Sequence, residues 1–134
     1  MSKKKKSSAL LVDDIGKKIE LEKHNASFFD WAWRYADLPK RVYISGAVSG
    51  RNKGATAHKF AQAERYITAL GLVPVNPLKN GLPATATWEQ HMKKDIALLG
   101  TCSRVLMLPD WEESKGARQE LKEAIKQNKK ITFL

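Results

Sequence analysis

Val105-Leu-Met-Leu-Pro-Asp-Trp-Glu-Glu-Ser-Lys-Gly-Ala-Arg-Gln-Glu120 is the stretch of sequence that decides the fold. Its first residues are apolar and predict a buried strand, its middle is a polar loop, and its end predicts a helix that opens at Ser114 and Gly116 and carries Glu120 in its first turns. In open α/β sheets, ligands bind at the carboxyl ends of the strands, and a helix N-terminus there favours anionic groups. This stretch therefore predicts the position of a ligand site.

Outward from this stretch, the chain alternates between strand and helix patterns. The predicted strands are 41–45, 72–75, 104–108 and 130–134, and the predicted helices between them are 57–70, 88–99 and 115–127. Strands separated by helices form parallel sheets with right-handed crossovers. We therefore expect an α/β fold, a three-layer sandwich of the flavodoxin or Rossmann kind around a small parallel sheet of about four or five strands.

The N-terminal part of the chain has a different character. Residues 1–8 are polar and charged, which predicts a disordered basic tail. Residues 9–40 predict a helical, aromatic-rich extension, with Ser27 as the N-cap of a short helix that holds Phe28, Trp31 and Tyr35 among its aromatics. Such a helix would dock on the main domain, expected at 41–134, or on a second subunit.

Composition limits the class of protein and of partner. A chain of 134 residues with 43% hydrophobic residues is long enough for one domain with a real core. Its net charge of +10 favours a negatively charged partner, either nucleic acid or a phosphorylated small molecule. Nucleic acid is the less favoured of the two, because the lysine clusters at Lys3–Lys6 and Lys126–Lys130 lie near the chain ends, where solvated tails are common.

Cysteine content and hydropathy indicate the compartment. Cys102 is the single cysteine, so an intramolecular disulfide is excluded and a reducing cytoplasm is expected. No apolar run approaches the roughly 20 residues that span a bilayer, and no signal peptide is visible, so no membrane partner is expected. His58, His91 and Cys102 do not have metal-ligand spacing. We expect neither a metal nor a cofactor.

Two carboxylates are candidates for chemistry. Asp95 lies within the apolar stripe of its predicted helix, where a carboxylate is costly unless it is paired or belongs to a site. The alternative for Asp95 is a structural cap or an ion pair with an arginine. Glu120 lies on the border of the stripe of its own helix, one turn beyond Gly116. A solvated surface glutamate is the ordinary alternative, but its position after a buried strand and a Ser/Gly opening favours a site.

The loop after the first strand, Ser45-Gly-Ala-Val-Ser-Gly50, consists of small residues. Such a loop permits close approach of a phosphate or a sugar, although it matches neither a dinucleotide-binding nor a Walker motif. The residues expected to bind substrate are Tyr43, Ser45, Gly46, Ser49, Gly50, Asp110, Trp111, Ser114 and Gly116.

Taken in order, these residues resemble the nucleoside 2-deoxyribosyltransferase superfamily, and within it a group of bacterial and phage proteins. The resemblance covers residues 41–134 and is carried by the segments Tyr43-Ile-Ser-Gly46, Asn76-Pro77, Trp88…Met92…Asp95 and Leu108-Pro-Asp-Trp…Ser114-x-Gly116…Glu120. It implies that Glu120 is the catalytic glutamate, that Asp95 is the second active-site carboxylate, and that Tyr43 is an aromatic residue near the site. It also implies no metal and a homodimer or larger homo-oligomer with the site at a subunit boundary.

Ser114 separates the branches of that superfamily. Transferases that act on free nucleosides tend to have aspartate at the corresponding position, whereas the 2'-deoxynucleoside 5'-monophosphate N-hydrolases have serine in the pattern that Ser114-Lys-Gly-Ala-Arg-Gln-Glu120 reproduces. A serine at a helix N-terminus accepts a phosphate that an aspartate would repel. In the first loop, however, Ala47 and Ser49 stand where those hydrolases have a serine and an arginine.

The leading hypothesis is cleavage of an N-glycosidic bond in a nucleotide or nucleoside, by hydrolysis or by deoxyribosyl transfer, with Glu120 as the nucleophile. One alternative is a non-catalytic module, phage-like in character, that binds a nucleotide or grips a host protein. The less favoured alternative is a nucleic-acid-binding protein, whose affinity would fall steeply with salt.

Overall fold

A computed structural model describes residues 40–134. The expected basic tail and nearly all of the expected aromatic extension, residues 1–39, lie outside the described residues. Along the described chain the elements are β1 (Arg41–Ser45), α3 (Lys53–Ala69), β2 (Val73–Val75), the 3-10 turn η2 (Pro77–Lys79), α4 (Trp88–Gly100), β3 (Arg104–Met107), η3 (Trp111–Glu113), α5 (Lys115–Lys126) and β4 (Lys130–Phe133).

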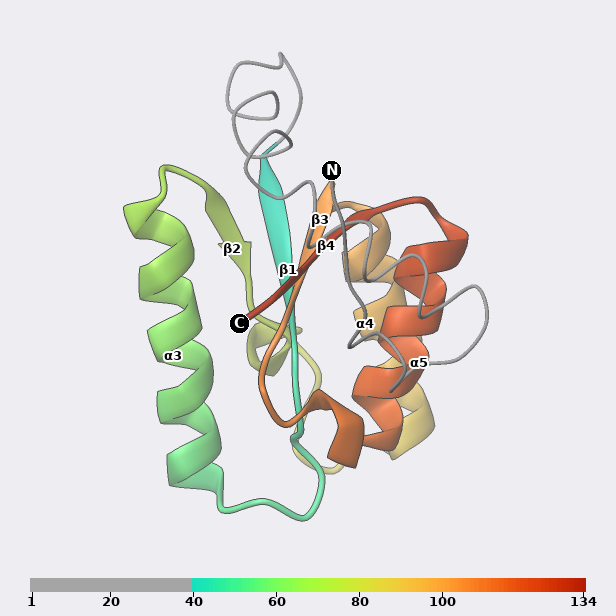
Figure 1. Ribbon diagram of the computed structural model, residues 1–134. Helices are drawn as coiled ribbons and strands as arrows, with labels where there is room; N and C mark the ends of the chain where they lie inside the picture. The colour runs from blue at the N-terminus through green and yellow to red at the C-terminus, as the bar shows by residue number, and fades with distance from the viewer. Residues whose placement is uncertain (1–39) are drawn as a thin grey trace.

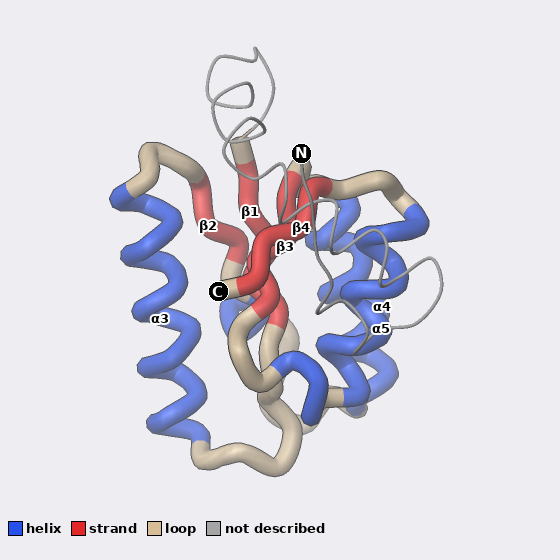
Figure 2. Tube along the Cα trace, in the orientation of Figure 1, coloured by secondary structure: helices blue, strands red, loops and turns tan. Residues whose placement is uncertain are grey.

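The strands form a single parallel sheet in the order β2-β1-β3-β4. Helix α3 covers one face of this sheet, and α4 and α5 cover the other (Figure 1). The expected α/β three-layer sandwich with a small parallel sheet is confirmed, with four strands among the described residues. The tube in Figure 2 shows the same layering, with the strands between the helices.

Side-chain alternation along the strands divides the core into two layers. On the α3 face, Val42, Ile44 and Leu106 pack with Phe60 and Ile67 of α3. On the opposite face, the buried cluster consists of Tyr43, Val75, Leu99, Cys102, Val105, Met107, Trp111, Ala117, Leu121, Ala124 and Ile131. Because successive side chains of a strand point to opposite faces, Ser45 lies on the same face as Tyr43, the face that α4 and α5 cover.

The order of the strands creates a switch point. From β1 the chain crosses through α3 to β2 on one side, and the next strand, β3, pairs with β1 on its other side. The connections that leave β1 and β3 therefore diverge at their carboxyl ends, and such crevices are where open α/β sheets bind ligands.

Most predicted element bounds agree with the structure to within a residue. The exception is α3, which begins at Lys53 instead of Ala57. The side chain of Asn52 accepts a hydrogen bond from the Ala55 backbone N–H and caps the helix at that earlier position. No helix within residues 40–134 is long and apolar enough to cross a membrane.

Candidate active site

Glu120 lies in the second turn of α5 with 5% of its surface exposed. The Tyr43 hydroxyl donates to Glu120 Oε2 at 2.7 Å, and the Ser45 hydroxyl donates to Oε1 at 2.6 Å. Both donors come from β1, where alternation points them toward α5. The structure therefore brings three sequence-predicted residues together, at the carboxyl half of a central strand.

Burial controls the protonation of this cluster. It raises the pKa of Glu120 to about 7, and the negative charge of Asp95 adds to the rise, while the hydrogen bonds from Ser45 and Tyr43 oppose it. Burial and the neighbouring Glu120 carboxylate likewise raise the pKa of Tyr43 well above its ordinary value. Within residues 40–134, no lysine or arginine forms an ion pair with Glu120.

Asp95 approaches the cluster from α4. It is half-buried on the face that also carries Trp88, Met92 and Ile96, as the helical stripe predicts. The Asn80 amide donates to Asp95 Oδ1 at 2.9 Å. Burial raises the pKa of Asp95 above its ordinary value, and the hydrogen bond from Asn80 opposes this rise. The partner of Asp95 is thus a side-chain amide, and neither the structural cap nor the arginine pair considered as its alternatives is present within residues 40–134.

Asp110, after β3, is tied to the first loop. Its Oδ1 accepts a hydrogen bond from the Ala47 backbone N–H at 3.1 Å, and its Oδ2 forms an ion pair with Lys59 of α3. Lys59 Nζ also donates to the Ala47 carbonyl at 2.9 Å. Partial burial pushes the pKa of Asp110 up, but the contacts with Lys59 and Ala47 outweigh it, and the net pKa is lowered. Asp110 therefore braces the loop that borders the switch point.

The opening of α5 has the predicted form. Ser114 is its N-cap, and the Ser114 hydroxyl accepts from the Ala117 backbone N–H at 3.0 Å. A Cβ on Gly116 would lie 3.2 Å from the Met92 sulfur of α4. The small residue thus allows α5 to approach α4, which brings Glu120 and Asp95 into one neighbourhood.

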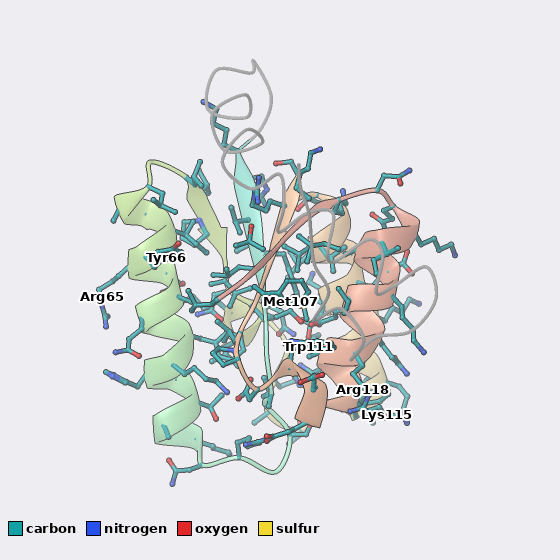
Figure 3. The ribbon with its side chains drawn as sticks, in the orientation of Figure 1. Arg65, Tyr66, Met107, Trp111, Lys115 and Arg118 are labelled. Carbon is teal, nitrogen blue, oxygen red and sulfur yellow. The ribbon has the colours of Figure 1, made fainter. Side chains whose placement is uncertain are left out.

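The remaining predicted residues divide into two groups. Ser49 and Gly50 form the exposed group, in the loop after β1, where Gly50 has a φ of 75°. Gly46 and Trp111 form the buried group. Gly46 lies so close to Leu108 that a Cβ on it would be 2.8 Å from the Leu108 Cδ1. Trp111 lies in the core on the α5 side of the sheet (Figure 3), with its ring centroid 5.7 Å from that of Phe133. The structure does not bring Trp111 into contact with the Glu120 cluster through any hydrogen bond.

Sequence reasoning missed Asn80, His91 and Lys59. Asn80 and His91 lie 3.0 Å apart, measured from Asn80 Nδ2 to His91 Nδ1. Two features of the sequence could have indicated two of these residues. His91 precedes Asp95 by one helical turn, and Lys59 directly precedes Phe60, which belongs to the buried stripe of α3. Residues 40–134 contain no group of three or more histidine, cysteine or carboxylate side chains arranged to hold a metal ion.

A shallow, mainly apolar groove lies elsewhere, beside α4. Its lining residues are Leu82, Pro83, Thr85, Ala86, Gln90, Lys93, Lys94 and Ala97. None of the residues predicted for the site lines it.

Known proteins share both a family and a fold with this chain. Residues 40–133 match the family model described as a domain of unknown function, DUF4406. The chain belongs to the DUF4406 family. No curated protein matches this DUF4406 chain.

A solved structure shares the fold of this DUF4406 domain. It is a 2-desoxiribosyltransferase from Leishmania mexicana, with a TM-score of 0.54 and 21% sequence identity, covering 72% of this chain. The chain spans 64% of the length of that transferase. The resemblance to the nucleoside 2-deoxyribosyltransferase superfamily is confirmed at the level of the fold.

Proposed function

We propose that this protein cleaves the N-glycosidic bond of a nucleoside or nucleotide, with Glu120 as the nucleophile. The observation that carries the proposal is a buried carboxylate held through both oxygens by the hydroxyls of Tyr43 and Ser45, at the carboxyl end of a central strand. The fold that the DUF4406 domain shares with a 2-desoxiribosyltransferase supports the same class of chemistry.

The proposed reaction begins with ionised Glu120. One carboxylate oxygen attacks the anomeric carbon of the sugar while the bond from that carbon to the base nitrogen breaks, and the electron pair leaves with the base. The base then takes up a proton. The resulting glycosyl ester on Glu120 is released by water in hydrolysis, or by a second base in transfer. Tyr43 and Ser45 orient the carboxylate, and Asp95 orients the sugar or assists the departing base.

A monophosphate is the substrate form that we favour. Ser114 caps α5 without adding negative charge near the helix N-terminus, where an anion is stabilised. The net charge of +10 supports an anionic substrate as well. In this proposal Ser49 and Gly50 of the loop after β1 border the substrate together with Asp110, which contacts that loop. Trp111 contributes by anchoring η3 to the core.

A chromatographic assay for free base tests the proposal. The full chain is incubated with deoxynucleoside monophosphates, ribonucleoside monophosphates and free nucleosides, beside Glu120→Gln and the matched control Glu123→Gln on the same helix. We expect base release that Glu120→Gln lowers on the order of a thousandfold or more and that Glu123→Gln leaves near wild type. Because the nucleophile must be ionised, kcat/KM should rise with pH through about 7, the pKa of Glu120.

Two results would count against the proposal. Base release that persists in Glu120→Gln would remove Glu120 from the chemistry. No release from any member of the panel by the folded protein would favour the non-catalytic nucleotide-binding module, and calorimetric titration with the same monophosphates would then show binding without turnover.

A further inference from the structure

Asn80 is a buried residue whose side-chain oxygen and both amide hydrogens have partners. It follows η2 and has 7% of its surface exposed. Its Oδ1 accepts the Leu82 backbone N–H at 3.0 Å, which fixes the orientation of the amide. The two hydrogens on Nδ2 then face Asp95 Oδ1 at 2.9 Å and His91 Nδ1 at 3.0 Å.

This orientation determines what the two neighbours can do. Because Asn80 Nδ2 is a donor, His91 Nδ1 acts as the acceptor in this contact, which places the imidazole N–H on Nε2. Asp95 is held through Oδ1 alone. Within residues 40–134, Oδ2 of Asp95 has no hydrogen-bond partner, so it remains available to a ligand.

We propose that Asn80 is a positioning residue, which donates one amide hydrogen to Asp95 and the other to His91 and thereby presents Asp95 Oδ2 to the sugar or base of the substrate. The assignment rests on the proposed function, since it gives Asp95 its role. An amide suits this position because it binds a carboxylate without a charge of its own, whereas a second carboxylate would repel Asp95.

The chain contains a matched control for Asn80. Asn76 is also buried, at 8% exposure, and its Oδ1 likewise accepts a backbone N–H two residues later, that of Leu78 at 2.9 Å. Asn76 makes no hydrogen bond to Asp95 or His91. Asn80→Asp and Asn76→Asp each keep the backbone cap and add one negative charge, but only Asn80→Asp removes the amide hydrogens beside Asp95.

The test combines NMR spectroscopy with kinetics on the full-length protein. Carbon-13 shifts of the Asp95 carboxyl are followed against pH, and nitrogen-15 shifts of His91 are read at pH 8. Titratable groups that interact with Asp95 are Tyr43 of β1, His91 of α4 and Glu120 of α5. In wild type we expect His91 with its proton on Nε2, and in Asn80→Asp an Asp95 midpoint at least about one pH unit higher. Asn76→Asp should change neither.

Kinetic measurements on the same variants are the second part of the test. Loss of a hydrogen bond to a charged group should lower kcat about 10- to 100-fold in Asn80→Asp, with a smaller change in KM, and Asn76→Asp should stay within about twofold of wild type.

The outcomes separate this proposal from the proposed function. A wild-type His91 protonated on Nδ1 would overturn the proposal without any variant. An Asp95 midpoint unchanged in Asn80→Asp, or an equal loss of kcat in both variants, would overturn it as well. If wild type releases no base, the proposed function fails, and the NMR arm still decides whether Asn80 orients Asp95.

Discussion

At the scale of single residues, Glu120 and Asp110 show how environment separates two carboxylates. Glu120 contacts two hydroxyls and no cation, so burial dominates and raises its pKa to about 7. Asp110 contacts Lys59, and its pKa is lowered. Groups whose environments push their pKa values apart are those to which different roles can be assigned. Asp110 is accordingly an ionised residue that holds the loop after β1 in place, and Glu120 is a carboxylate that changes protonation near neutral pH.

The raised pKa of Glu120 predicts a stability difference that depends on pH. Below about pH 4.5 Glu120 is protonated in both folded and unfolded protein; as pH rises toward 7 the unfolded state loses the proton first, so wild type loses stability. Glu120→Gln has no such proton. Its free energy of unfolding, relative to wild type, should therefore rise by about 3 kcal/mol between pH 4.5 and 7.5.

Urea unfolding at several pH values measures this difference. For Glu123→Gln, the difference from wild type should stay within about 0.5 kcal/mol over the same range. If the difference in free energy of unfolding between Glu120→Gln and wild type does not change with pH, the raised pKa that burial gives to Glu120 is contradicted.

At the scale of elements, the start of α5 serves two purposes. Ser114 satisfies a backbone N–H of the first turn, and Gly116 allows the close contact with α4. The same helix end faces the divergence of the chain after β1 and β3. A substitution at Ser114 therefore changes helix stability, substrate preference or both, according to the chemistry of the new side chain.

Ser114→Ala and Ser114→Asp separate these two effects. Alanine removes the cap and should cost about 1 kcal/mol in urea unfolding, whereas aspartate is as good an N-cap as serine and should cost less than about 0.5 kcal/mol. Aspartate adds negative charge, so the ratio of kcat/KM for a monophosphate to that for its nucleoside should fall at least about tenfold. Thr87→Asp makes the same exchange at the N-cap of α4 and should leave the ratio unchanged. An unchanged ratio in Ser114→Asp would exclude Ser114 from phosphate binding.

At the scale of the whole molecule, the charge and the sheet topology act together. The parallel order β2-β1-β3-β4 places the candidate site at the switch point. The net charge of +10 favours the approach of anionic molecules to the protein as a whole. The homo-oligomer and the cytoplasmic location expected from the sequence stay predictions.

Salt should therefore affect charged and neutral substrates differently. Between about 20 and 300 mM NaCl the Debye length falls roughly fourfold, so kcat/KM for a monophosphate should drop several-fold while that for the neutral nucleoside changes little. Initial rates of base release at both salt concentrations measure the two responses. Equal responses would show that the net charge does not steer the substrate, and tight binding of duplex DNA at low salt would favour the nucleic-acid alternative.

The sequence by itself determined the features that repeat over short distances. Apolar spacing identified the strands and helices, the Ser/Gly opening identified the start of α5, and the stripe of α4 placed Asp95 on an inner face. The start of α3 was predicted too late, because the polar segment at Asn52 shows no apolar period and only the observed cap reveals the helix.

Only the tertiary structure decided which side chains meet. Ser45 and Tyr43 reach Glu120 across 75 and 77 residues of sequence, Lys59 reaches Asp110 across 51, and Asn80 reaches Asp95 across 15. It also placed the Trp111 ring in the core against Phe133. Local periodicity specifies the face on which a residue lies, but its partner depends on strand order and on the helices that cover each face, and these are set by packing of the whole sheet.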